Sequence, residues 1–154
     1  MTLSQTPGTL KRFRRTPWRF QQTFQTPLQN LEPFVATILS GREPIHAASV
    51  TFDQVVFEPK RLLALFARHA LVPEYGYDWC VAATNPEEVK ELLQATLSDW
   101  VDFLFIPTPK PFVIYADHDG FTTFYANTKS NLNGVVQTLT ASGFRNVPDY
   151  ERTF

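Results

Sequence analysis

The sequence predicts an α+β domain with a mostly antiparallel sheet of four or five strands, three to four helices packed chiefly on one face, and an extended N-terminal arm. The first reason is that β-branched and aromatic runs alternate with segments of helical periodicity. The second is that the last three strand-like runs follow one another too closely for helical crossovers, which favours antiparallel pairing. The third is the composition. A chain of 154 residues that is 44% hydrophobic and 19% charged suits one domain with a substantial core.

Charge divides the chain into a basic arm and an acidic body. The first 31 residues contain five cations and no acidic residue, so with a net charge of -1 the remainder carries -6. Prolines follow Thr6, Thr16 and Thr26, and each disfavours helix at the threonine before it. We therefore expect an arm over 1–26, flexible up to residue 10 and extended beyond it, and a single domain over 27–154.

Two helices and two strands are expected in the first half of the domain. The strands are indicated by β-branched and aromatic residues, and the helices by apolar residues at helical spacing. Pro33 should break or restart the first helix, and Gly41 should end it. The expected ranges are 28–40 (helix), 46–57 (strand), 59–72 (helix) and 77–84 (strand).

The clearest helix signal follows Asn85. This residue is a good N-cap, Pro86 suits the first helical position, and Glu88 stands where a capping box places its acidic residue. Apolar residues then recur at i, i+3, i+4 and i+7 as far as Val101. The opposite, polar face contains Glu87, Glu91 and Asp99.

The last three strands are expected near 103–106, 112–117 and 121–126. Asp119-Gly120 is a favoured pair for a two-residue hairpin turn, which would place Tyr115 opposite Phe124. A final helix should follow. Its expected cap is Ser130, and its expected stop is Gly143 with a hydrophobic contact from Phe144.

Catalytic signals are weak. Asp117 and His118 form the densest ionisable group at the hairpin tip, but neighbours on a strand point to opposite faces, and Asp119 suits the turn itself. The lone cysteine, Cys80, excludes an internal disulfide and falls among apolar residues in a strand. No phosphate-binding glycine loop, nucleophile elbow or metal-binding histidine pattern is present, so neither a cofactor nor a metal site is expected. The protein is therefore more plausibly a binding domain than an enzyme.

Three functions remain open, and no set of residues identifies a known family. The preferred one is a non-enzymatic binding or regulatory domain that docks another protein, in the physical manner of an inhibitor or immunity protein. Its acidic helix face and an adjacent tryptophan would meet a basic partner, through Glu87, Glu91, Asp99 and Trp100. The first alternative is a small enzyme or ligand-binding domain with an aromatic pocket and polar groups at Asp117 and His118.

The second alternative is an accessory nucleic-acid binder. Cations mixed with an aromatic residue in the arm could neutralise phosphates and stack on bases. The residues concerned are Lys11, Arg12, Arg14, Arg15, Trp18 and Arg19. No apolar run approaches the length of a membrane-spanning helix, and a cytoplasmic location is expected.

Overall fold

A seven-stranded antiparallel sheet organises the protein. The structure, a computed structural model, describes residues 1–152. The strands are arranged in the order β1-β4-β3-β5-β6-β7-β2. Their bounds are β1 Thr2–Gln5, β2 Phe20–Gln25, β3 Ala47–Val55, β4 Trp79–Ala83, β5 Val101–Thr108, β6 Val113–Ala116 and β7 Phe121–Ala126.

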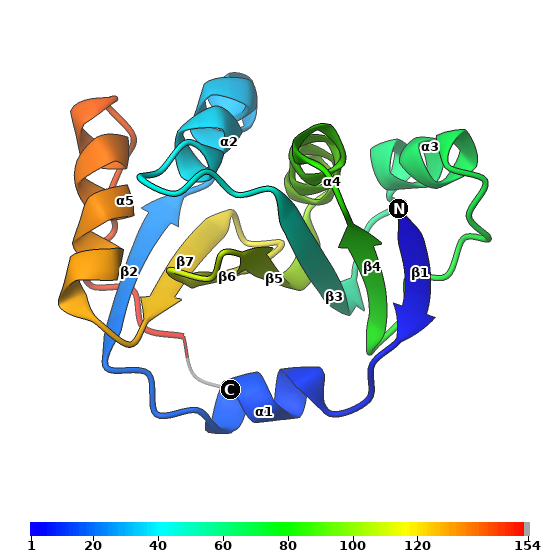
Figure 1. The fold of residues 1–154 in the computed structure, drawn as a ribbon, viewed down its shortest axis with the longest axis horizontal. Helices are drawn as coiled ribbons and strands as arrows, with labels where there is room; N and C mark the ends of the chain where they lie inside the picture. Colours follow the sequence, from blue (N-terminus) through cyan, green and yellow to red (C-terminus); the bar gives the residue numbers. More distant parts are fainter. Residues whose placement is uncertain (153–154) are drawn as a thin grey trace.

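Helices lie on both faces of the sheet, but unequally. Within residues 1–152, α2, α3, α4 and α5 cover one face, and α1 crosses the other (Figure 1). The bounds are α1 Thr9–Arg15, α2 Leu31–Leu39 after a 3-10 turn η1 (Leu28–Asn30), α3 Lys60–Arg68, α4 Pro86–Ser98 and α5 Lys129–Ala141. The predicted class is confirmed, although the predicted numbers of strands and helices are too low.

The missing elements come from the predicted arm, which is neither flexible nor extended throughout. β1 pairs with β4, and β2 pairs with β7, so the first 25 residues supply both edges of the sheet. Between them, α1 occupies a segment free of proline, which begins after Gly8 at a φ of 85°. The local sequence shows the prolines but not the distant strands with which the segment pairs. The expectation of an extended arm was therefore wrong.

The hairpin between β6 and β7 has a different register from the predicted one. Tyr115 lies opposite Thr123, not Phe124. The amide of Asp117 donates to the Phe121 carbonyl at 3.0 Å, which leaves a three-residue turn. Gly120 has a φ of 90°, as such a turn requires of its last residue. The Asp-Gly pair thus marks the turn correctly but does not determine its length.

Helix ends follow the sequence closely. Asn85 caps α4 by accepting from the Glu88 amide at 3.0 Å, and the Gly143 stop of α5 is present, with a φ of 87°. Two details differ. The cap of α5 is Thr128 rather than Ser130, and Pro33 sits in the first turn of α2, where a missing N–H costs no helical hydrogen bond.

The core consists of two unequal clusters, one on each face. The larger one fills the space between the sheet and its four-helix layer. The smaller one fixes α1 to the opposite face and contains Leu10, Phe13, Leu104, Val113, Tyr115 and Tyr125, with Trp18 and Ile106 packed against it. Phe13 is its centre, because its ring stacks on Tyr115 at 5.8 Å and meets Tyr125 edge-on at 5.1 Å.

This packing makes Phe13 a test of how α1 is held. We expect Phe13→Ala to lower the free energy of unfolding by about 3–5 kcal/mol, because it removes a buried aromatic ring. The exposed Arg15 in the same helix provides a control, and Arg15→Ala should change stability by less than about 0.5 kcal/mol. Urea denaturation measures both. Equal effects of the two substitutions would contradict the packing of α1 on the sheet.

Candidate functional site

Three carboxylates lie on the α1 side of three adjacent strands, near one end of the sheet. A bulge in β3 sets Asp53 and Gln54 against Asp102 of β5, and Asp117 follows β6. Asp102 is only 4% exposed and Asp117 only 5%. Burial of carboxylates is costly unless they are hydrogen-bonded and paired with cations, so the partners of this carboxylate row determine its chemistry.

Asp53 contacts one residue of α1 and one residue of the sheet. The Arg14 guanidinium forms an ion pair with it, and the Tyr115 hydroxyl donates to the same carboxylate oxygen. Burial raises the pKa of Tyr115 well above its usual value, and the neighbouring Asp53 raises that pKa further. The phenol therefore stays protonated and acts as a hydrogen-bond donor.

Asp102 orients His118. Its Oδ1 accepts from the His118 backbone amide at 2.6 Å and contacts the ring Nδ1 at 2.8 Å. Since a carboxylate can only accept, the hydrogen of this contact belongs to Nδ1. The imidazole side chain is 31% exposed, and its Nε2 is 3.8 Å from Asp119. Asp102 thus engages Nδ1 and fixes the orientation of the ring, and Nε2 is the nitrogen left for other contacts.

Asp117 holds the hairpin turn and the C-terminal segment together. Its Oδ1 accepts from the amides of Asp119 at 3.0 Å and Phe121 at 3.1 Å. Its Oδ2 accepts from the Tyr150 hydroxyl at 2.9 Å and forms an ion pair with Arg152. Asp117 therefore attaches the C-terminal segment that contains Tyr150 and Arg152 to the sheet.

Aromatic contacts reinforce this attachment. The Tyr150 ring stacks on Phe121 with centroids 4.2 Å apart, and the Arg152 guanidinium carbon lies 4.5 Å from the centre of the Tyr115 ring. Burial raises the pKa of Tyr150, and the negative charge of the nearby Asp119 raises it further.

The two catalytic candidates are therefore close in the fold but engaged separately. Asp117 serves the turn and the C-terminal segment, and His118 serves Asp102. Sequence reasoning missed Asp53 and Asp102. The available signal was a charged residue within or at the start of an apolar strand, and Asp102 between Val101 and Phe103 is the clearer case. Within residues 1–152, no group of three or more His, Cys, Asp or Glu side chains could hold a metal ion.

The four predicted partner-binding residues differ in the contacts that they make within the protein. Glu87 is exposed at the start of α4, while Glu91 forms an ion pair with Arg68 at 3.1 Å. At the other end of that helix, Asp99 accepts from the Leu62 amide at 2.8 Å, and burial raises its pKa. Trp100, with a φ of 57°, turns toward the hairpin, where a Cβ added at Gly120 would lie 3.3 Å from its ring.

The predicted nucleic-acid-binding residues differ in their contacts. Trp18 packs against the smaller core cluster, and its indole Nε1 donates to the Phe13 carbonyl at 3.2 Å, while Arg14 binds Asp53. The remaining cations are exposed. They are Lys11, Arg12, Arg15 and Arg19.

Cys80 lies outside the carboxylate row. The Cys80 side chain is buried, and burial raises its pKa, which disfavours the reactive thiolate. Among the helices of residues 1–152, none has the length and apolar character needed to cross a bilayer.

No protein-family model, curated protein or solved structure matches this chain.

The carboxylate row predicts a large difference between two neighbouring aspartates. We expect Asp117→Ala to destabilise the protein by about 3–5 kcal/mol, because it removes a buried carboxylate that pairs with the half-buried Arg152 side chain and holds the turn. Asp119 is 69% exposed, and Asp119→Ala should cost less than about 1 kcal/mol. Urea denaturation compares the two, and hydrogen exchange should show faster opening of 146–152 in the first variant only. Similar stabilities would refute the attachment of this segment through Asp117.

Buried tyrosines predict a loss of stability at alkaline pH. Burial raises the pKa of Tyr125 to about 12, so with rising pH the unfolded chain loses this proton before the folded protein does. The free energy of unfolding should then fall by about 1.4 kcal/mol per pH unit for this group between pH 10 and 12. Denaturation at several pH values measures the slope. Tyr125→Phe should make the slope less steep, and an unchanged slope would show that Tyr125 does not contribute.

Proposed function

We propose that this protein is a small non-enzymatic binding protein, and that it docks an acidic surface of a protein partner through α1. The observation that carries this proposal is the orientation of the helix. Its apolar side, with Leu10 and Phe13, is buried against the sheet, while Lys11, Arg12 and Arg15 are exposed on the outside. We call these three residues, together with Arg19, the basic ridge.

The way in which the ridge is held supports a docking role. Ordering a flexible segment opposes binding, and a segment that is already folded avoids that cost. The strands β1 and β2 fix the two ends of the connection that contains α1, and Phe13 fixes its middle. The cations are thus presented from a rigid support rather than from a loose arm.

Protein rather than nucleic acid is the favoured partner class. Binding to single strands depends on aromatic side chains that stack on bases, in addition to cations. Here Phe13 and Trp18 pack toward the sheet. The whole chain also carries a net charge of -1, which gives little long-range attraction for a polyanion. A local acidic patch on a protein needs only a complementary patch, and such complementarity mainly raises the association rate and the selectivity.

The acidic helix face is a weaker candidate for the docking surface. Glu91 is already paired with Arg68, and Asp99 binds the first turn of α3. Docking through these residues would break contacts within the protein. The basic ridge has no such conflict, because the exposed cations form no ion pair within residues 1–152.

A capture experiment with a matched charge control tests the proposal. The full chain, the triple variant Lys11→Gln/Arg12→Gln/Arg15→Gln and the control Lys60→Gln/Arg61→Gln/Arg68→Gln are each used to capture partners from native lysate after nuclease treatment. The control removes the same charge from α3, on the other side of the sheet. The first variant loses three exposed ion pairs with the acidic surface of the partner, which should weaken partner binding about tenfold. The control should bind the partner as the unmodified protein does.

Each result has a defined meaning. A stoichiometric protein that survives nuclease, is lost at high salt and is lost with the ridge variant supports the proposal. Equal capture by both variants, capture that depends on nucleic acid, or the absence of any stoichiometric protein partner would overturn it.

A further inference from the structure

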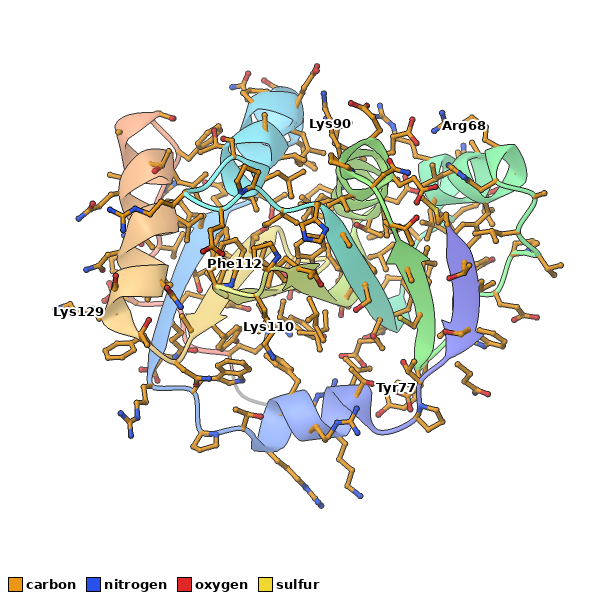
Figure 2. All side chains as sticks on the ribbon, in the orientation of Figure 1. Arg68, Tyr77, Lys90, Lys110, Phe112 and Lys129 are labelled. Carbon is orange, nitrogen blue, oxygen red and sulfur yellow. The ribbon has the colours of Figure 1, made fainter. Side chains whose placement is uncertain are left out.

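A groove of about 1030 Å³ lies on the helix side of the sheet. Three segments line it: residues 37–45 at the end of α2 and beyond, residues 109–112 before β6, and residues 129–138 of α5. Figure 2 labels Lys110 and Phe112 on the second segment and Lys129 at the start of the third. The volume is at the upper end of the range of small-molecule sites, about 300–1000 Å³.

The lining combines an apolar floor with a cationic rim. The floor is made by buried core side chains, which are Ile38, Ile45, Phe112 and Val135. The charged lining residues are three cations, Arg42, Lys110 and Lys129, and a single acid, Glu43. The groove therefore carries a net positive charge in a protein whose total charge is negative.

These cations differ from others on the same side of the sheet. Lys90 and Arg68 form ion pairs with Glu32 and Glu91. By contrast, within residues 1–152 none of the three groove cations has a carboxylate oxygen within 4.0 Å. Their charge is available to a bound anion.

Gly134 faces open space in the groove wall. It lies inside α5 and lines the groove, yet its φ is not in the left-handed region and a Cβ added to it would meet no atom within 4 Å. Neither backbone conformation nor crowding therefore requires glycine here. Glycine weakens a helix relative to alanine, so the feature that it does provide is space in the groove wall.

We propose that this groove binds a small free carboxylic acid with an apolar chain or ring. The apolar part would lie on the floor beside Phe112, and the carboxylate would meet the rim cations. The N-terminal turn of α5 adds a favourable dipole to the charge of Lys129. A neutral ligand would leave the rim charges unused, and an anion without an apolar part would make no contact with the floor.

Octanoate is a direct probe, and octylammonium is its matched control of opposite charge. Each is titrated into the ¹⁵N-labelled full chain while amide shifts are recorded. Octanoate should cause saturable shifts confined to 37–45, 109–112 and 129–138, with affinity at least about tenfold higher than that of octylammonium. Comparable binding of the two probes, shifts centred elsewhere, or no saturable shifts with octanoate would overturn the proposal.

Variants test the groove wall and the rim separately. Gly134→Leu should fill the groove and weaken octanoate binding at least about tenfold, whereas Gly134→Ala should raise the melting temperature and change binding less than about twofold. Lys129→Gln should weaken binding about threefold, and Lys90→Gln, outside the groove, should leave it unchanged. If Gly134→Leu does not fold, the double variant Lys110→Gln/Lys129→Gln provides the test. Binding unaffected by these groove changes would overturn the proposal.

This inference is independent of the docking role of α1. The basic ridge variant should bind octanoate like the unmodified protein, because none of its three substituted residues lines the groove. The two proposals therefore fail in separate experiments.

Discussion

Both edges of the sheet come from the first 25 residues, so the chain between them must cross five intervening strands. With strands about 4.8 Å apart, that crossing is about 29 Å. A seven-residue helix spans only about 10 Å of it, and short extended segments cover the rest. The crossing works because its apolar residues, above all Phe13, find partners on β6 and β7. This one constraint decides where α1 lies and which of its side chains face outward.

The same constraint explains why one end of this sheet face is polar. The apolar residues beneath α1, such as Leu104 and Val113, are covered by the helix. Farther along the sheet, this face instead carries Asp53 and the buried Asp102 and Asp117. Each of these carboxylates has its own cationic or imidazole partner. The partners come from α1, the hairpin turn and the C-terminal segment, so the carboxylate row joins three distant parts of the chain.

Local signals in the sequence identified most helix ends, although the cap of α5 was placed at Ser130 instead of Thr128, and long-range signals were absent. Asn85, Pro86 and Gly143 act through neighbours a few residues away, so their roles could be inferred from the sequence. The pairing of β2 with β7 and the contact between His118 and Asp102 depend on residues far apart in the chain. No periodicity encodes them. The predicted hairpin register was wrong because Asp119-Gly120 suits both a two-residue and a three-residue turn. The groove could not be foreseen, because its walls come from three separate segments.

The pairing of β2 with β7 has a consequence for folding during synthesis on the ribosome. During synthesis from the N-terminus, residues 20–25 leave the ribosome about a hundred positions before the strand that they pair with, as the partnership of Phe24 with Thr122 illustrates. Until then their backbone donors and acceptors lack the native partner. Unsatisfied strand edges favour association with other chains, and non-local pairing slows folding. The β2 edge of this sheet can therefore form only after β7 has been synthesised, later than the β1 edge, which pairs with β4.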